Sequence, residues 1–385
     1  MKRISLIAIM ALMGIGSVAA KSSTTLPIVG EVVKATNPLI QYVGRVSFAK
    51  NETASFNFPG TSILARFQGS SLKMICRPMT GYFMAQVDGC EPFKVGFNAE
   101  RDSVVTVAAA LPKGEHQVKL MYVIEGLFRT PEFRGFVLDK GCSLVKSPDL
   151  PERKIEFIGN SITCGYGVES IEMTDPFEDE TENHWLTYAN IVSDSLNAQH
   201  TSISRSGIGV YRNYDGPKAG SDENMPWQYE YTLFNKHDEK WDFNKYQPQL
   251  VCINLGTNDL STNNYDIALY EKNYRMFLTT VRSKYPNAKI VLITGPMLGE
   301  KESGEQREVL DRICSDANKK GFTLPDEVRK ARKGKNKGDK DICRFDFTFQ
   351  AGDLGYGASW HPSKLQHQKM ADELLPFLRN LMGWE

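Results

Sequence analysis

The fold can be inferred starting from residues 154–167, which read Lys-Ile-Glu-Phe-Ile-Gly-Asn-Ser-Ile-Thr-Cys-Gly-Tyr-Gly. The apolar run in its first half predicts a short strand that is buried on both faces. The run ends at Gly159, and Ser161 follows among turn-forming residues. Open α/β sheets gather their reactive groups at the carboxyl ends of strands, so Ser161 is a candidate nucleophile. By itself the stretch is equally compatible with an ordinary turn that carries an exposed serine.

From residue 154 onward, apolar runs alternate with longer amphipathic segments. This alternation is typical of βαβ units and predicts a parallel sheet. The expected strands are 154–159, 200–204, 250–255, 289–294 and 344–348. The expected helices are 184–196, 265–285, 305–320 and 362–381, the last with Pro362 in its first turn. An aromatic and polar insertion at 211–248 is long enough to predict a functional segment.

The residues before this region follow a different pattern. Residues 21–146 contain short runs between Gly, Asn and Pro, which predict an all-β domain, a sandwich of the jelly-roll kind. The expected strands are 43–48, 54–58, 62–67, 72–76, 82–87, 94–97, 103–108, 116–123 and 135–138. Residues 147–153 carry two prolines and are expected to link this domain to a second one at 154–385.

The first 20 residues have the features of a secretory signal peptide. Lys2 and Arg3 precede an apolar stretch from Ile4 to Ile15, and small residues follow at 17–20. The apolar stretch is too short to span a bilayer, and no other stretch qualifies, so no membrane span is expected. The cleavage region has no Cys for lipid attachment. We therefore expect a secreted or periplasmic protein.

Charge and cysteine content exclude several functions. Without the leader, 44 basic residues face 46 acidic ones, which provides no electrostatic basis for nucleic-acid binding. A basic stretch at 329–340 is expected to be a solvated loop. The seven cysteines show no CxxC spacing, so no metal site is expected, and Cys252 is expected to be a core thiol. Pairing of Cys90 with Cys142 stays open, as does the oligomeric state.

Other candidate residues follow the ends of the predicted strands. Gly207 follows the second strand and Asn258 follows the third, so both are expected at the same sheet edge as Ser161. His361 lies just before the last helix, where it is a candidate base for a nucleophilic serine.

These segments resemble the four sequence blocks of the SGNH, or GDSL-like, hydrolases. The blocks appear in order as Gly-Asn-Ser at 159–161, Ser-Gly at 206–207, Gly-Thr-Asn-Asp at 256–259 and His-Pro at 361–362. The longer wording at 157–167 and 210–216 is similar to carbohydrate esterase family 2. That resemblance covers nearly the whole mature chain. It implies a jelly-roll domain joined to a three-layer α/β/α domain of flavodoxin-like topology.

The resemblance also implies roles for individual residues. Ser161 would attack an ester carbonyl and His361 would transfer the proton. The backbone N–H groups of Ser161 and Gly207 and the amide of Asn258 would form the oxyanion hole. The usual triad acid, three residues before the histidine, is absent because that position is Ala358. A backbone carbonyl is then expected to hold the histidine in a Ser–His dyad, with Asp353 as the alternative partner.

The expected reaction is hydrolysis of acetyl esters on plant-type polysaccharides such as xylan or glucomannan, or on their oligosaccharides. No metal or cofactor is implied. Aromatic side chains suit the C–H face of a sugar ring, so Trp360, Trp227 and Tyr229 are candidate substrate contacts. Two alternatives stay open: a lipase or thioesterase of the same superfamily, and a noncatalytic carbohydrate-binding protein.

Overall fold

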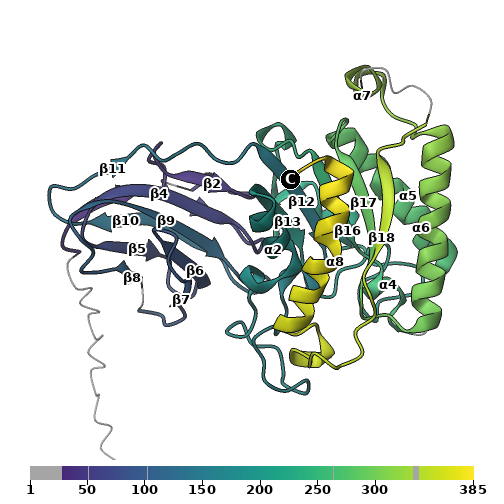
Figure 1. The fold of residues 1–385 in the computed structure, drawn as a ribbon, viewed down its shortest axis with the longest axis horizontal. Coiled ribbons are helices and arrows are strands. Elements are labelled where there is room, and N and C mark those ends of the chain that lie inside the picture. Colours follow the sequence, from purple (N-terminus) through teal and green to yellow (C-terminus); the bar gives the residue numbers. More distant parts are fainter. Residues whose placement is uncertain (1–27, 51, 102, 263, 333–337) are drawn as a thin grey trace, which may run out of the picture.

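The computed structural model describes residues 28–385 except 51, 102, 263 and 333–337, so the predicted leader at 1–20 lies outside the described residues. Figure 1 shows two domains: antiparallel strands form one, and a parallel sheet with helices on both faces forms the other. This confirms the predicted combination of a β-sandwich with an α/β domain.

The N-terminal domain is a sandwich of two antiparallel sheets. One sheet is formed by β1 (Glu31–Lys34), β10 (Glu132–Leu138), β5 (Leu72–Cys76) and β8 (Val104–Ala108), with β3 (Ala54–Ser55) paired to β10. The other is formed by β11 (Leu144–Val145), β4 (Ser62–Gly69), β9 (Gly114–Tyr122), β6 (Gly81–Val87) and β7 (Phe93–Phe97), with β2 (Gln41–Val43) paired to β4. Edge-to-face contacts of Phe56, Phe83 and Tyr122 fill the space between the sheets.

The sequence prediction was wrong at the margins of the sandwich. The expected strand 43–48 shares only Val43 with β2, and the prediction missed β1 and β11. Strand β1 lies at a sheet edge and is mostly exposed, so it lacks the alternation of apolar and polar residues that marks a half-buried strand. Strand β11 has two residues, which is too short for any periodic signal.

The C-terminal domain is built on five parallel strands in the order β13 (Ala198–Ser204), β12 (Arg153–Gly159), β16 (Leu250–Asn254), β17 (Lys289–Thr294) and β18 (Ile342–Asp346). Numbered along the domain this order is 2-1-3-4-5, which is the flavodoxin-like topology. Helices α2 (Tyr188–Ser195) and α8 (Lys364–Met382) pack on one face of the sheet. Helices α5 (Ile267–Lys284) and α6 (Glu300–Lys320) pack on the other. The expected three layers are therefore present.

Three predicted helices begin later than expected; one of them is α5, which starts at Ile267 and not at residue 265. The segment expected to be helical from residue 184 starts with a 3-10 turn, η1 (His184–Leu186), before α2. Helix α8 starts at Lys364, because the Ser363 hydroxyl caps it by accepting a hydrogen bond from the Gln366 N–H. Pro362 therefore precedes the cap and does not occupy the first turn.

The aromatic insertion at 211–248 is folded against the sheet. It contains α3 (Met225–Gln228), a hairpin of β14 (Tyr231–Leu233) and β15 (Lys236–Lys240), and η2 (Phe243–Lys245). The buried guanidinium of Arg45, from the sandwich, donates to the carbonyl oxygens of Tyr229 and Tyr231. It also lies 5.0–5.6 Å from four aromatic ring centres, those of Phe58, Tyr229, Trp241 and Phe243. The insertion thus anchors the two domains to each other.

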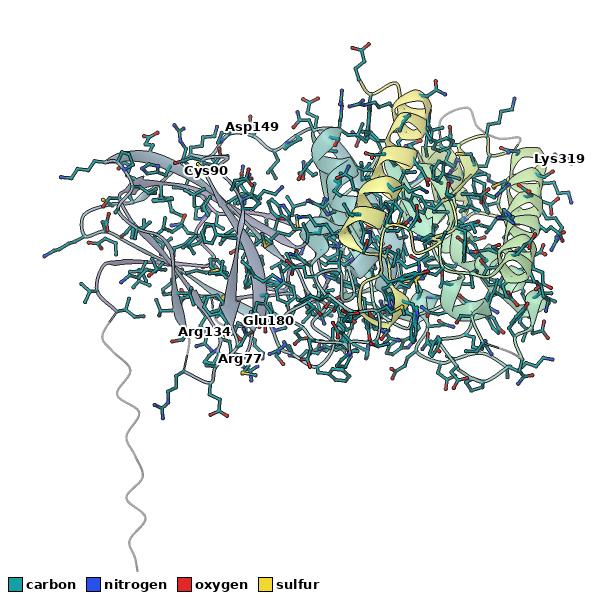
Figure 2. The ribbon with its side chains drawn as sticks, turned by 60° about the horizontal axis from the view of Figure 1, so that its bottom comes forward. Arg77, Cys90, Arg134, Asp149, Glu180 and Lys319 are labelled. Atoms are coloured by element: carbon teal, nitrogen blue, oxygen red, sulfur yellow. The ribbon has the colours of Figure 1, made fainter. Side chains whose placement is uncertain are left out.

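Figure 2 shows Asp149 on the segment between the domains and Glu180 against the sandwich. The Glu180 carbonyl accepts a hydrogen bond of 2.7 Å from Lys94 of β7.

The basic stretch at 329–340 is less solvated than expected where it is described. Its first residues belong to α7 (Asp326–Ala331), and Arg332 is buried in an ion pair with Asp339.

All seven cysteines lie among the described residues, and all are free thiols, including Cys90 and Cys142. Cys252 is buried in β16, as expected for a core thiol. None of the described helices is both long and apolar enough to cross a membrane.

Candidate active site

Ser161 is the first residue of α1 (Ser161–Cys164), directly after β12. The Asn160 side chain caps this helix by accepting from the Ile162 N–H at 3.0 Å. A Cβ at Gly159 would lie 2.0 Å from the Thr163 hydroxyl, so the sharp turn into the helix requires glycine there. Strand β12 lies between β13 and β16, where the strand order reverses, which is the usual place of a site in such sheets.

The structure brings His361 to this serine across 200 residues of sequence. The Nε2 atom of His361 lies 2.8 Å from Ser161 Oγ, within hydrogen-bond reach of a nucleophile and its base. The histidine follows η3 (Ala358–Trp360), in which Ser359 and Trp360 have left-handed φ angles of 51° and 58°. Such residues cost about 1–2 kcal/mol each, and they are found mainly where function requires a particular geometry.

Backbone carbonyl groups occupy the place of the missing triad acid. The Nδ1 atom of His361 lies 3.0 Å from the Ala358 oxygen and 3.2 Å from the Ser359 oxygen. With its proton on Nδ1, the ring donates to these oxygens and presents a free lone pair on Nε2 to Ser161. Asp353, the alternative partner, is exposed, and no hydrogen bond between it and His361 occurs in the described residues.

Packing explains why residue 358 is small. Ala358 is buried against Gly167, where an added Cβ would lie only 2.3 Å from the Ala358 Cβ. A carboxylate side chain at position 358 would therefore have to displace the segment that follows the nucleophile. Desolvation lowers the pKa of His361 to about 4, although the two carbonyl contacts act in the opposite direction.

An aromatic ring covers the imidazole. Tyr166 stacks on His361 with ring centres 4.2 Å apart, and Phe177 lies 4.6 Å beyond Tyr166. The stack fixes the plane of the histidine ring and excludes water from one face. Tyr166 was not predicted from the sequence, because its position five residues after Ser161 shows no relation to the loop of His361 until the fold places the two side by side.

The candidate oxyanion donors lie at the ends of three neighbouring strands. The Ser161 N–H is at the start of a helix, where N–H groups have no partner within the helix. Gly207 follows β13 with φ 73°, and its carbonyl accepts from the Tyr214 N–H at 2.8 Å. Asn258 lies in α4 (Thr257–Leu260), after β16; one hydrogen of its amide donates to the Ile208 carbonyl at 2.8 Å, and the amide carries a second.

Asp259 is part of the Gly-Thr-Asn-Asp block, and in the structure it holds a loop of the site. Its buried carboxylate accepts the N–H groups of Val210, Tyr211 and Arg212 at 2.8–3.1 Å. Burial raises the pKa of Asp259 to about 6, while those N–H groups act in the opposite direction. The carboxylate therefore holds the loop that carries Gly207.

The three aromatic residues predicted to contact substrate differ in their exposure to solvent. Trp360 is 53 % exposed beside His361, as a sugar-binding ring must be. Trp227 is partly buried, and its ring lies 3.8 Å from that of His237 in the hairpin. The prediction for Tyr229 was wrong: it is 0 % exposed and donates to the buried Glu156 carboxylate at 2.6 Å. A buried acid needs a donor, and Tyr229 supplies it. Tyr214, which the prediction omitted, is 61 % exposed.

Within the described residues no group of three or more His, Cys, Asp and Glu side chains is arranged to hold a metal ion. The site as built consists of a serine, a histidine, backbone donors and an amide. This set is sufficient for acyl transfer by nucleophilic catalysis.

The chain is similar to known proteins over both domains. The family described as "Carbohydrate esterase 2 N-terminal" matches residues 42–148, and "GDSL-like Lipase/Acylhydrolase" matches residues 155–374. The cellulase/esterase CelE of Acetivibrio thermocellus is 34% identical over 351 residues, which are 90% of this chain but only 40% of that protein. An acetylxylan esterase / glucomannan deacetylase of Cellvibrio japonicus is 27% identical over 358 residues, 91% of each chain.

Among solved structures, a family two carbohydrate esterase from Clostridium thermocellum, in complex with cellohexaose, has a TM-score of 0.79 and 34% identity. The match covers 90% of this chain and 100% of that one. Both domains and their connection are thus shared with that structure.

Proposed function

This chain belongs to carbohydrate esterase family 2, within the GDSL-like hydrolases, and we propose that it removes acetyl groups from plant-type polysaccharides such as xylan or glucomannan, or from their oligosaccharides. One observation carries the proposal: the 2.8 Å contact between Ser161 Oγ and His361 Nε2, with Nδ1 held by backbone carbonyls. The similarity to an acetylxylan esterase / glucomannan deacetylase supports the substrate class.

In the proposed reaction, Ser161 Oγ attacks the acetyl carbonyl while its proton moves to His361 Nε2. Negative charge develops on the carbonyl oxygen, and the N–H groups of Ser161 and Gly207 and the amide of Asn258 stabilise it. His361 then protonates the sugar oxygen, which leaves as an alcohol. Water, deprotonated by His361, hydrolyses the acetyl-serine and regenerates the site.

The rigid environment supports a dyad without a carboxylate. A triad acid orients the imidazole and stabilises its charged form. Here the carbonyl contacts and the Tyr166 stack supply orientation. The carbonyl dipoles supply part of the charge stabilisation. A lower rate than that of a full triad is the expected cost.

The test compares wild type with Ser161→Ala and His361→Ala on 4-nitrophenyl acetate and on acetylated xylan and glucomannan. Each change should reduce acetate release by at least a thousandfold, since the two residues act as one unit. A matched control is Ser283→Ala, because that serine lies in α5 and its hydroxyl donates to the Thr280 carbonyl of the same helix. Acetate release by Ser161→Ala at the wild-type rate would overturn the proposal.

Two further comparisons separate the alternatives. A lipase or thioesterase would favour longer acyl esters, so the rate should fall from acetyl to octanoyl if the proposal holds. Carbohydrate binding without cleavage is a second candidate function. It is favoured by the cellohexaose complex of the related esterase and by the exposed rings of Trp360 and Tyr214. Glycan binding by wild type with no acetate release from any substrate would select it.

The proposal includes export, because the leader predicted at 1–20 targets the secretory pathway. Recovery of a chain cleaved after Ala20 from the medium or periplasm is the expected result, read by N-terminal sequencing.

A further inference from the structure

A carboxyl group of the sandwich domain reaches the backbone of the candidate oxyanion loop. Glu125 lies just after β9 and is 4 % exposed. Its Oε2 atom accepts a hydrogen bond of 2.6 Å from the N–H of Ser206 in the other domain. Ser206 immediately precedes Gly207, the predicted oxyanion donor. A length of 2.6 Å is at the short end of the range for N–H···O hydrogen bonds in proteins.

The same loop is also held from its other end. Asp259 accepts three successive N–H groups at 210–212, and the Asn258 amide donates to the Ile208 carbonyl. These contacts come from α4 of the hydrolase domain. Glu125 holds the opposite end of the loop, where the chain leaves β13. Between the two, Gly207 has a φ of 73°, and glycine has little conformational preference of its own. The direction of its N–H therefore depends on how both ends are fixed.

Glu125 is itself placed by buried groups. Its backbone N–H donates to Glu182 Oε2 at 3.0 Å, and Glu182 is fully buried. The Cys164 thiol of α1 lies 3.9 Å from Glu125 Oε2, so the same oxygen faces the nucleophile helix. Burial raises the pKa of both Glu125 and Glu182. An uncharged acceptor oxygen at position 125 should consequently be tolerated.

We propose that Glu125 is a positioning residue that aims the Gly207 N–H at the reacting carbonyl, so that the sandwich domain completes the catalytic apparatus. This inference rests on the proposed esterase function. It gives the N-terminal domain a role beyond structural support, because a group from that domain sets the geometry of the oxyanion hole.

Three substitutions at this position distinguish the effect of the hydrogen-bond acceptor from the effects of the side chain's charge and volume. Glu125→Gln keeps an acceptor oxygen at the same reach, and kcat should stay within about threefold of wild type. Glu125→Leu keeps the approximate size without an acceptor, and Glu125→Asp retracts the oxygen by about 1.5 Å, one carbon–carbon bond. Both should lower kcat at least tenfold, since loss of an oxyanion donor costs about a hundredfold or more.

The Michaelis constant distinguishes positioning from general damage. Oxyanion donors act in the transition state, so KM for an acetyl ester should change less than twofold in Glu125→Leu and Glu125→Asp. Ser47→Ala is the matched control. Ser47 is a buried sandwich residue whose hydroxyl donates to the Glu239 carboxylate of β15 in the other domain. It should lower the melting temperature without lowering kcat.

A readout independent of activity is hydrogen exchange of the amides at 206–207 in the full chain. Exchange should be at least tenfold faster in Glu125→Asp and Glu125→Leu than in wild type, and close to wild type in Glu125→Gln. Unchanged exchange in Glu125→Asp, or kcat within twofold of wild type, overturns the inference. If wild type hydrolyses no ester, the proposed function fails while exchange still reports whether Glu125 holds the loop. If Glu125→Leu does not fold, the comparison of Asp with Gln decides.

Discussion

The pH dependence of the reaction follows from how His361 is held. A base must be neutral to accept the serine proton, so activity is lost as pH falls through the pKa of the imidazole. Desolvation lowers that pKa from 6.5 to about 4, and the partners of Nδ1 are carbonyl oxygens that carry no full charge. The difference corresponds to roughly 3 kcal/mol between the protonation states.

We therefore expect the acid limb of kcat/KM to have its midpoint well below 6.5. At pH 5.5 a histidine of pKa about 4 is roughly 97 % neutral, whereas one of pKa 6.5 is about 9 % neutral. The enzyme should accordingly keep nearly full activity at pH 5.5. The assay is acetate release from an acetylated sugar, quantified by NMR from pH 4 to 8, with circular dichroism at each pH to confirm folding.

Two variants at the stacked ring test the cause. Tyr166→Ala removes the ring 4.2 Å from His361 and admits water, so the midpoint should rise by about one pH unit toward 6.5. Tyr166→Phe keeps the stack and should keep the midpoint. A wild-type midpoint at or above 6.5 would refute the reasoning, since it would require a carboxylate at Nδ1. Asp353→Asn would then lower the midpoint, whereas we expect it to have no effect.

Three further predictions concern packing and stability. Gly167→Ala should reduce kcat at least tenfold and lower stability by about 1–3 kcal/mol, because the new methyl would lie 2.3 Å from the Ala358 Cβ and shift the segment of His361. The control is Gly383→Ala, which should leave kcat unchanged, because Gly383 also has a positive φ but lies in open space. The free energy of unfolding should decrease as the pH is lowered below 6.5, by roughly 1.4 kcal/mol per pH unit for each buried histidine that stays neutral in the folded state. Burial lowers the pKa of His184 to about 4, that of His367 to about 3 and that of His200 well below 6.5. A melting temperature that is constant from pH 7 to pH 5 would contradict this prediction. Arg45→Met should lower stability by about 2–4 kcal/mol with kcat preserved, because it removes the buried cation between the domains, and calorimetry showing no loss would argue against that anchor.

Most of the α/β domain was predictable because β12, β16 and β17 are short, largely apolar runs that end at or just before a Gly or Asn. The nucleophile segment and the Gly-Thr-Asn-Asp segment follow those ends, and parallel strands bring their ends to one edge. His361 precedes the last helix. Strand β1 was not predictable, since it lies at a sheet edge, is mostly exposed and has no periodic pattern. The start of α8 was not predictable either, because both Pro362 in the first turn and Ser363 as the N-cap are common ways to begin a helix, and the structure uses Ser363.

The residues of the candidate site also fall into those that the sequence predicts and those that it does not. Ser161, Gly207, Asn258 and His361 could be chosen from the sequence, because each follows a strand end or precedes a helix within a recognisable block. Tyr229 could not be excluded, because nothing local in an aromatic insertion shows which ring will turn inward to bond a buried acid.

The two-domain fold and the serine and histidine of the site could be inferred from the sequence, because apolar periodicity and short motifs are local properties of the chain. The surroundings of the two residues follow from contacts that form when the chain folds. The Tyr166 ring on His361 and the Glu125 carboxyl against Ser206 are contacts between residues that lie far apart in the sequence. Such contacts depend on where the folded chain brings distant segments together, and no sequence spacing records them.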